Sequence, residues 1–557
     1  MIVVWCRFRD SPVMEDFRVT AKIRTATASR KHASRKHRSR RQQAWQKQWQ
    51  RRQRRIAQRL DKQHREPEDG LSGERPVLQG ANVQCVMGER QCGTAYGGVV
   101  VMHQLVRELQ LAEAIDQRLQ LLKWHKPYHE SDHVLNFAYN ALCDGTCLED
   151  MELRRTDEAY LDGLGAKRTP DPTTAGDFCR RFEEHDVRTL MEVFDETRLQ
   201  VWQRQSPEFF EEARIDMDGT LVETGAEKKQ GIDIAYNGVW GYHPLVVSLA
   251  NTGEVLSIVN RSGNRPSYEG AAAEADRAIA LCRRGGFRRI RLRGDTDFTQ
   301  TTHLDRWNAD DVKFVFGMDA RIPLQIQADE LPDSAWKRLR RPARYKVQTK
   351  RRRKRAQVKE RIVKKRKFEN LKLVSEDVAE MKYRPVACRQ TYRLIIVRKN
   401  LICRDEQGEL FPNYRYFFYL TNDRTATPAQ IVFSANDRCD QENLNAQLKG
   451  GVCALTTPVD TLVSNWAYMV MTSLAWNLKA WLALWSMPSG TSLEQTTQRA
   501  QQERVLRMEF KTFVNYLMRL PALVSHRARR VVVRFISWSP LQPVLFRTLE
   551  ALGHRRC

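Results

Sequence analysis

The spacing of apolar residues divides the chain into a helical region and a later region that mixes strands and helices. From Gly97 to about Gln205, apolar positions recur every three or four residues, as in VVVMHQLVRELQLAEAI, and this period predicts helices. Three further segments repeat it: His133–Cys143, Ala175–Glu184 and Leu190–Trp202. We therefore predict an all-helical domain over residues 95–205.

Beyond residue 210 the pattern becomes that of short strands. The alternating run RIDMDGT, at residues 214–220, is followed by the apolar stretches Tyr242–Ala250 and Glu254–Asn260. Asn251, Thr252 and Gly253 between these stretches predict a tight hairpin turn.

An Ala-rich helix over Tyr268–Arg284 comes next, and Gly285-Gly286 ends it. A strand that ends at Asp295, a helix over Thr302–Asn308 and a strand over Val312–Met318 follow. Three antiparallel strands, helix, strand, helix and strand is an order that a mixed sheet flanked by helices accommodates. The predicted fold class is therefore α/β, with a ribonuclease-H-like sheet.

The remainder of the chain adds a β-rich segment and more helices. Tyr392–Val397 and Tyr414–Leu420 are the clearest strands between residues 320 and 415. After Thr427-Pro428, a helix carries DRCDQENLNAQLK, and further helices are expected to about residue 525, before a last strand RRVVVRFI and a short tail. The stretch Trp466–Trp485 has the length and apolarity of a membrane span, but Asn477 and Lys479 near its middle favour a buried core helix.

Positive charge is concentrated in two segments of this chain. The formal net charge is +26, and residues 30–55 contain 12 Lys and Arg residues and no acid. Residues 337–367 contain 18 Lys and Arg residues and one acid, Glu360, so the rest of the chain is nearly neutral. Concentrated positive charge predicts a polyanionic partner, with nucleic acid first, although solvated basic tails alone would give the same count.

The cysteines give no sign of a structural zinc site. Twelve are dispersed along the chain, and neither Cys85/Cys92 nor Cys143/Cys147 has a matching second pair at zinc-finger spacing. Dispersed thiols are typical of a reducing cytosol.

Three carboxylates on separate elements form the candidate site: Asp218, Asp295 and Glu442. Neighbouring first and fourth strands would place the two aspartates close together, and the helix of Glu442 could supply a third ligand. Hard oxygen ligands suit Mg²⁺ or Mn²⁺, and two such ions could support an in-line phosphoryl displacement. Taken singly, Asp216 shares a strand face with Asp218, Asp297 competes with Asp295, and Glu442 could be a solvated surface residue.

The sequence resembles the DDE transposases of bacterial insertion sequences, in the branch with a β-strand insertion between the second Asp and the Glu. The motif DGT at 218–220, followed by GVWGYHPL at 238–245, is similar to the first-Asp region, and RGDTDF is similar to the second-Asp region. RSGN at 261–264 also resembles a family feature, and Arg438, Glu442 and Lys449 match the Y-(2)-R-(3)-E-(6)-K spacing. The tyrosine position of that signature is Ala435 here.

The resemblance implies a transposase that cuts DNA at the terminal inverted repeats of an element and joins the ends to target DNA. It implies Asp218, Asp295 and Glu442 as catalytic residues and ligands of two Mg²⁺ or Mn²⁺ ions, and Arg438 and Lys449 as phosphate contacts. It also implies a homodimer on paired ends in the bacterial cytoplasm, associated with the nucleoid and not with a membrane. Lys350, Arg351, Arg352 and Arg353 in the basic run are further predicted DNA contacts.

The predicted organisation has five parts, which are a flexible basic arm (1–75), a helical DNA-binding domain (95–205), the first part of the catalytic core (210–320), a β-rich basic insertion (321–425), and the second part of the core with C-terminal helices (426–540). Two other functions stay open. Ala435 is the main support for a catalytically inactive DNA-binding relative, and another ribonuclease-H-like nuclease is the third possibility.

Overall fold

We analysed a computed structural model of the chain, which describes residues 43–59, 61, 92–341, 371–404, 410–527 and 530–553. The chain forms two units, Met1–Arg90 and Gln91–Cys557. In the first unit, residues 43–59 are helical, as the sequence QAWQKQWQRRQRR allows. Most of the predicted basic arm lies outside the described residues, as do Lys350, Arg351, Arg352 and Arg353.

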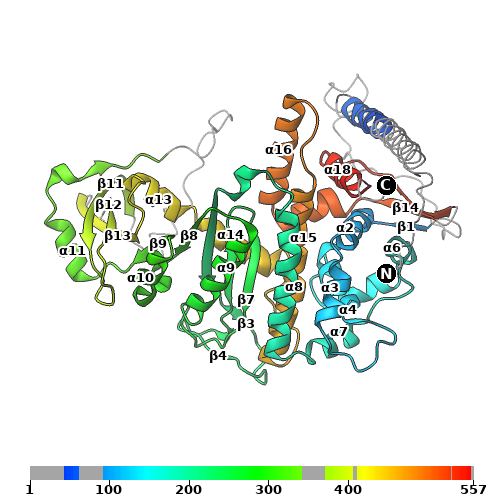
Figure 1. The fold of residues 1–557 in the computed structure, drawn as a ribbon, viewed down its shortest axis with the longest axis horizontal. Helices are drawn as coiled ribbons and strands as arrows, with labels where there is room; N and C mark the ends of the chain where they lie inside the picture. The colour runs from blue at the N-terminus through cyan, green and yellow to red at the C-terminus, as the bar shows by residue number, and fades with distance from the viewer. Residues whose placement is uncertain are drawn as a thin grey trace, which may run out of the picture. The chain divides into compact units, whose positions relative to one another are not determined.

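The second unit is built on a nine-stranded sheet with the order β10-β11-β12-β13-β9-β8-β2-β6-β7 (Figure 1). Its core strands are β2 (Glu212–Gly219), β6 (Leu245–Leu249), β7 (Glu254–Val259), β8 (Arg289–Gly294) and β9 (Val312–Met318). Strand β2 is antiparallel to β6 and parallel to β8, and β8 is parallel to β9. The predicted ribonuclease-H-like order is confirmed, including the adjacency of the first and fourth core strands.

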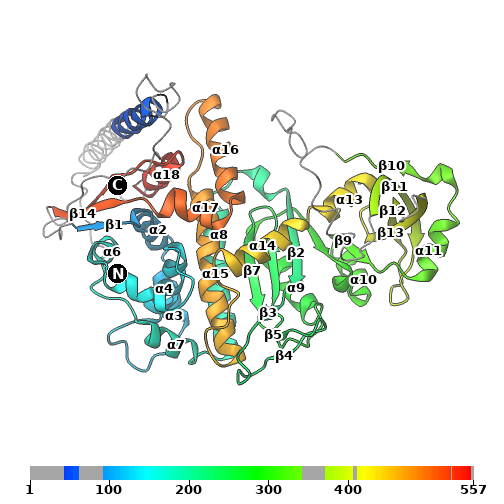
Figure 2. The same cartoon turned by 180° about the vertical axis from the view of Figure 1, so that it is seen from behind.

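The two faces of this sheet are covered by different helices. Helices α9 (Ala271–Gly285) and α10 (Thr301–Ala309) come from the crossovers, and α13 (Pro428–Asn436) and α14 (Cys439–Gly450) follow the insertion. In β9, Phe314 and Phe316 join the main core, where Trp307 of α10 packs, while Val315 joins a second cluster with residues of α13. Figure 1 shows α9 in front of the sheet, and Figure 2, from behind, shows α14 in front.

The β-rich insertion continues the core sheet instead of forming a separate layer. Its strands are β10 (Lys337–Arg338), β11 (Leu371–Tyr383), β12 (Tyr392–Arg404) and β13 (Leu410–Thr421). Strand β13 pairs antiparallel with β9, from Phe418 opposite Met318 to Thr421 opposite Val315. Both predicted strands are present and are longer than predicted. The segment is not wholly extended, because α11 (Ile322–Asp329) precedes β10.

A small sheet between β2 and β6 was not predicted. It consists of β3 (Val222–Glu223), β4 (Asp233–Ile234) and β5 (Trp240–Tyr242), in the order β3-β5-β4. The predicted strand over residues 242–250 is therefore two strands, β5 and β6. They are separated at Pro244, whose missing N–H cannot join a ladder.

The helical region and the C-terminal helices share one hydrophobic core. The main helices of the region are α2 (Gly97–Glu108), α3 (Leu111–Arg118), α4 (Glu130–Leu142), α7 (Pro172–Cys179) and α8 (Glu184–Trp202). Helix α15 (Leu462–Trp485) packs against α4, α8 and β7, and its residues from Ser464 onward are buried. The prediction of a buried core helix is confirmed. Among the residues that the structure describes, no helix is long and apolar enough to cross a membrane.

The C-terminal region differs from the prediction in two places. Helices were expected to about residue 525, but strand β14 (Ala522–Arg527) begins before that point, and the expected tail contains α18 (Gln542–Gly553). Strand β14 pairs with the predicted last strand β15 (Arg530–Phe535) and also with β1 (Cys92–Thr94). Because β1 is far from β14 in the sequence, the local sequence of β14 gives no sign of this pairing.

A buried ionic cluster joins α8 and α15 to the β6–β7 hairpin. Glu254 is fully buried, and its carboxylate accepts hydrogen bonds from Arg198 Nε at 3.1 Å, Trp202 Nε1 at 3.0 Å and Trp481 Nε1 at 2.8 Å. Arg198 also contacts Asp195 and the carbonyl of Val255. Paired and fully hydrogen-bonded charges are tolerated in a core, whereas an unpaired one is costly.

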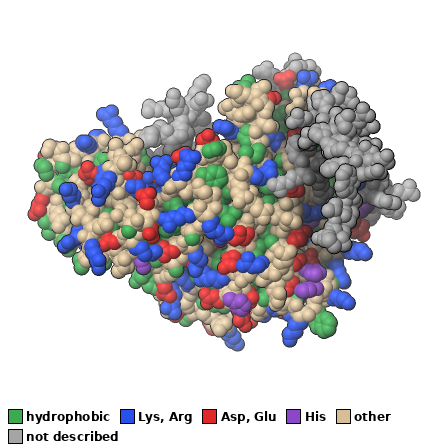
Figure 3. Space-filling model, viewed as in Figure 1, with side chains coloured by type: hydrophobic (Ala, Val, Ile, Leu, Met, Phe, Trp, Pro, Cys, Tyr) green, Lys and Arg blue, Asp and Glu red, His purple; other side chains and the backbone are tan. Residues whose placement is uncertain are grey.

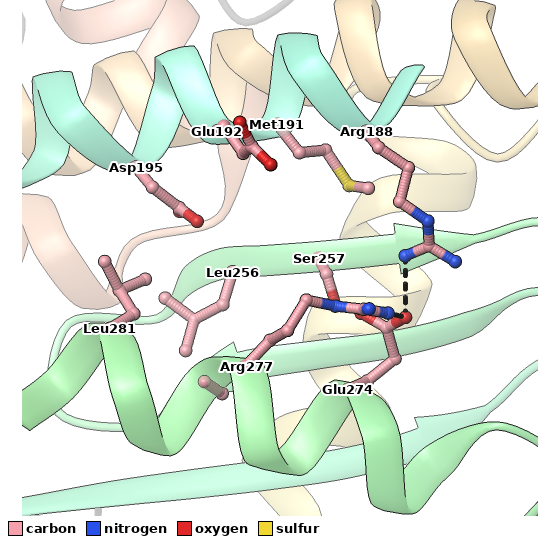
Figure 4. A pocket seen from close by; sticks show the side chains of 10 residues that line it. Arg188, Met191, Glu192, Asp195, Leu256, Ser257, Glu274, Arg277 and Leu281 are labelled. Atoms are coloured by element: carbon pink, nitrogen blue, oxygen red, sulfur yellow. Dashed lines mark hydrogen bonds and ion pairs between the residues drawn. The ribbon is translucent and has the colours of Figure 1, made fainter. Parts of the chain in front are cut away.

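Helices α8 and α9 also meet through a partly exposed ion pair. Arg188 NH1 of α8 lies 2.8 Å from Glu274 Oε1 of α9, beside a cavity of about 50 Å³ (Figure 4). Figure 3 shows Lys and Arg side chains interspersed with Asp and Glu on one face of the protein. This mixture agrees with a nearly neutral chain outside the two basic segments.

Replacing Arg198 with Met should destabilise the fold by about 3–5 kcal/mol, because Glu254 then stays buried without its cation. The matched control is Arg284→Met, which removes the exposed pair between Arg284 and Glu196 and should cost less than about 1 kcal/mol. Urea unfolding followed by circular dichroism measures both. Equal shifts in the two variants would show that the Glu254 cluster does not stabilise the fold.

Candidate active site

Adjacent strand ends and one helix position the three predicted acids. Asp216 of β2 lies opposite Arg293 of β8 in the parallel ladder, so Asp218 and Asp295, two residues further on, emerge from the same edge of the sheet. Glu442 lies in the first turn of α14, which packs against β2 (Figure 2). The structure therefore brings together three acids that are far apart in the sequence.

One guanidinium group lies at the centre of these acids. Arg438 NH1 is 3.8 Å from Asp218 Oδ1, and Arg438 NH2 is 3.8 Å from both Asp295 Oδ2 and Glu442 Oε1. Within the described part of the chain, the three carboxylates do not form a group whose ligand oxygens all lie within 4.8 Å of one another. The three acids therefore surround the Arg438 guanidinium without reaching the mutual spacing of that kind of ligand group.

Burial and mutual repulsion make the aspartates poor places for negative charge. Burial raises the pKa of Asp218 to about 7; the positive charge of Arg438 opposes this effect, and Asp295 and Glu442 add to it. Burial likewise raises the pKa of Asp295, again against the influence of Arg438. Three hard oxygen donors that repel one another in a partly buried site have the chemistry of a divalent-cation site, so these residues fit Mg²⁺ or Mn²⁺.

The neighbouring acids have different surroundings. Asp216 is buried and accepts two hydrogen bonds from Arg293, from Nε at 2.6 Å and NH2 at 2.7 Å. Arg293 NH1 also donates to the Ser434 carbonyl at 2.8 Å, which fixes the end of α13. Both oxygens of Asp216 are therefore engaged in a structural pair. The geometry favours Asp218 as the carboxylate that faces the site.

A similar distinction separates Asp295 from Asp297. The exposed Asp297 donates its backbone N–H to Asp295 Oδ1 at 3.0 Å, which orients the Asp295 side chain. Only Asp295 of this pair contacts Arg438. The geometry thus favours Asp295 as the second acid.

Asn445 is a site residue that the sequence analysis missed. Its Nδ2 donates to Asp218 Oδ2 at 2.9 Å and so orients the carboxylate. Lys449, one turn beyond, lies close enough to Asp218 for the carboxylate to oppose the burial that lowers the pKa of the lysine. Glu442, Asn445 and Lys449 follow one another at i, i+3 and i+7 on a single helical face, and this spacing could have revealed Asn445.

His243 lies in the motif GVWGYHPL, and the sequence alone indicated no role for it. A Cβ atom at Gly219 would lie 2.7 Å from His243 Nε2, so the glycine after Asp218 allows the imidazole to approach the strand. His243 Nδ1 is 2.8 Å from the Arg265 carbonyl, which only accepts, so Nδ1 carries the proton. Burial lowers the pKa of His243, which leaves Nε2 as an acceptor in the neutral ring.

The RSGN motif has a structural role beside this histidine. Arg261 is buried, and its Nε donates to the His243 carbonyl at 2.9 Å. Its NH1 donates to the carbonyls of Pro266, Ser267 and Glu269 at 2.6–3.2 Å. The arginine therefore holds the loop before α9 against the short connection between β5 and β6 that contains His243.

A cavity of about 340 Å³ adjoins the acid cluster, where β13 continues past the end of β9. Asp295, Arg438, Tyr419 and Ala435 are among its lining residues. Ala435 and Tyr419 also pack against the same small core cluster. The position of the signature tyrosine therefore lines a cavity that Tyr416 and Tyr419 also line.

The sequence matches the family described as Transposase DDE domain group 1 over residues 88–557. The chain belongs to this family of DDE transposases. Membership establishes DNA transposition as its function, DNA as its partner and divalent metal as its cofactor class.

More distant comparisons add little to this assignment. The chain is similar to a solved structure described as piggyBac transposase synaptic complex with hairpin DNA, at 11% identity and a TM-score of 0.34, with 77% of this chain and 84% of the other covered. No curated protein matches the chain significantly.

Substituting Asp218 with Asn should stabilise the metal-free transposase at pH 8. The pKa of Asp218 in the folded state lies above its ordinary value, so ionising this side chain destabilises the folded state. This destabilisation is complete above pH 7 and absent below about pH 4. The advantage of the variant should therefore shrink as the pH falls from 7 to 4. Thermal unfolding in EDTA measures it, with Asp297→Asn as control. A difference that does not change with pH would contradict the assigned pKa.

Proposed function

We propose that this transposase cleaves DNA at the ends of its element and joins those ends to target DNA, with Asp218, Asp295 and Glu442 as the metal ligands. The observation that carries the proposal is the convergence of all three carboxylates on one cation, Arg438, at 3.8 Å each. Acids from a strand end, the adjacent strand end and a covering helix have no evident structural reason to meet there. What the three carboxylates have in common is that each needs a nearby positive charge to offset its own negative charge.

We further propose Mg²⁺ or Mn²⁺ as the cofactor and two as the number of ions. Bound ions would supply a lowered pKa for the attacking hydroxyl and charge compensation for the leaving oxygen. Asp218 is held by Asn445 in the orientation that presents its other oxygen to the site. Glu442 has a side chain that is 63% exposed, so it can move toward the aspartates by changing rotamer.

Arg438 and Lys449 are proposed to bind phosphate when DNA is present. Lys449 belongs to the helix of Glu442, Arg438 is the N-cap residue of that helix, and both lie near Asp218. When cations neutralise the acids, the guanidinium is released from its three carboxylate neighbours and can form a charge-assisted pair with a phosphate. The same arginine would thus neutralise the acids in the free protein and hold DNA in the complex.

The remaining sequence predictions complete the proposed function. We propose that Lys350, Arg351, Arg352 and Arg353 bind the DNA backbone and that the helical region over residues 95–205 contributes to holding DNA ends. A homodimer on paired ends, acting in the bacterial cytoplasm at the nucleoid, is part of the same proposal.

An inactive DNA-binding relative is the second candidate, and Ala435 favours it. Against this candidate, Tyr419 lines the same cavity as Ala435 and Arg438, so a phenol ring is present beside the site. The acid cluster with its orienting residues is also intact. The match to a transposase family over residues 88–557 argues against an unrelated ribonuclease-H-like nuclease.

Asp218→Asn, Asp295→Asn and Glu442→Gln should each lower DNA cleavage and strand transfer at least about a thousandfold, because each removes a charged ligand of the proposed ions. Affinity for terminal-repeat DNA should be unchanged or higher. The assay uses terminal-repeat DNA with Mg²⁺, and Mn²⁺ in parallel.

The matched control for these variants is Asp297→Asn, two residues from Asp295, which should keep activity within a few-fold. Cleavage by the three variants at the wild-type rate would refute the assigned ligands. Binding by the wild type without cleavage in either metal would establish the inactive relative instead.

Replacing Lys350, Arg351, Arg352 and Arg353 with Gln should weaken DNA binding at every sequence. It should also flatten the plot of log K against log salt by up to roughly 3.6, or about 0.9 for each lost phosphate contact. Fluorescence anisotropy from low to high salt measures the slope, and Lys372→Gln/Lys382→Gln on β11 is the control. An unchanged slope would exclude these four residues from the DNA interface.

A further inference from the structure

The loop between α3 and α4, together with the start of α4, brings together two histidines and a glutamate that have no role in the proposed active site. His125, His129 and Glu130 each offer one ligand atom, and these atoms all lie within 4.8 Å of one another. Within the described residues, no other group of three such side chains meets this spacing. The catalytic acids, as noted above, do not meet it.

Glu130 is the unusual member of this group because it is fully buried. Its Oε1 accepts hydrogen bonds from the backbone N–H groups of Leu121 and Leu122, both at 3.0 Å. Its Oε2 is also buried and accepts no hydrogen bond; His125 Nε2 lies 3.2 Å away. A buried carboxylate oxygen without a donor is costly unless a cation balances it.

The two imidazole rings lie on the solvent side of this carboxylate. His125 and His129 are exposed, and their rings stack with centroids 4.7 Å apart and planes at 15°. Two imidazoles placed side by side over one buried carboxylate form a set of two nitrogen donors and one oxygen donor that opens to solvent. A simple ion pair between Glu130 and a protonated His125 would use only one of the rings.

We propose that His125, His129 and Glu130 form a second metal site, which takes a divalent transition metal, with Zn²⁺ as the best match. Imidazole nitrogen favours Zn²⁺ over Mg²⁺, and three protein ligands leave a fourth tetrahedral position for water. The proposed catalytic site consists of carboxylates, so the two sites differ in donor chemistry. This proposal does not depend on the assignment of the catalytic residues.

Metal at this site would tie a surface loop to the body of the helical region. His125 belongs to the loop after α3, while His129 and Glu130 stand at the start of α4. The same loop presents Trp124, whose side chain is 81% exposed, between Lys123 and His125. Metal occupancy would therefore fix the position of an exposed aromatic side chain next to basic residues.

Zinc binding to the full chain tests this site directly. Equilibrium dialysis with Zn²⁺ in excess Mg²⁺ should show one more bound Zn²⁺ in Asp218→Asn, where the catalytic site is disabled, than in Asp218→Asn/His125→Ala/His129→Ala. Co²⁺ should give the visible absorption of a four-coordinate site in the first variant and not in the second. Substituting Co²⁺ makes the coordination geometry observable.

Two further variants separate ligation from folding. Glu130→Gln keeps an acceptor for Leu121 and Leu122 but removes the charge, and it should weaken Zn²⁺ binding at least about tenfold. His185→Ala, another exposed histidine beside acids, should bind like its parent. Without metal, Asp218→Asn and Asp218→Asn/His125→Ala/His129→Ala should have the same melting temperature. Zn²⁺ should raise the melting temperature of Asp218→Asn alone, which is the parent protein in these comparisons.

Equal Zn²⁺ stoichiometry in the parent and the His125→Ala/His129→Ala variant would overturn the proposal. So would equal stabilisation of both by Zn²⁺, or a Co²⁺ spectrum that survives loss of both histidines.

Discussion

Carboxylates that are held near one another in a partly buried site repel, and this repulsion must be balanced by positive charge. Asp218, Asp295 and Glu442 lie close together where α14 covers the sheet, and in the free protein the positive charge of Arg438 offsets their repulsion. Burial, with a contribution from the other two acids, raises the pKa of Asp218 to about 7 against the influence of Arg438, so one arginine compensates this charge only in part. A site with this residual demand for cations is suited to bind divalent metal.

The other buried acids of the sheet are balanced differently. Asp216 has a complete bidentate pair with Arg293, and Glu254 has Arg198 and two tryptophan N–H groups. These pairs are satisfied within the fold and hold helices to the sheet. The difference between a satisfied acid and an unsatisfied one therefore separates Asp216 from the proposed metal ligand Asp218, although the two are only two residues apart on one strand.

The sequence was sufficient for the core sheet because its signals are local. The hairpin turn at Gly253, the helix end at Gly286 and the apolar runs of β8 and β9 each lie within one short segment. It failed for β14, which pairs with β1 hundreds of residues away as well as with β15, and for the small sheet around β5, whose strands are only two or three residues long. Pairing over such distances leaves no local periodicity.

The same limit applied to the site. Motif spacing indicated Asp218, Asp295 and Glu442, but it could not choose between Asp216 and Asp218, because both share a strand face. Their partners distinguish them, because Arg293 pairs with Asp216 whereas Arg438 and Asn445 contact Asp218. His243 was missed because its position depends on contacts with Gly219 and Arg265 that its own segment does not reveal, whereas the helical spacing of Glu442, Asn445 and Lys449 could have indicated Asn445. Family membership over residues 88–557 supplies the reaction, and the geometry suggests which residues carry it.

A crystal structure of the protein grown with Mn²⁺ tests the central claim most directly, because anomalous scattering locates the ion. We predict an anomalous peak within about 2.5 Å of carboxylate oxygens from both Asp218 and Asp295, with the Arg438 guanidinium moved away from the acids. Arg438 remaining among the three carboxylates, with no peak beside Asp218 or Asp295 at saturating Mn²⁺ and pH 8, would contradict the account.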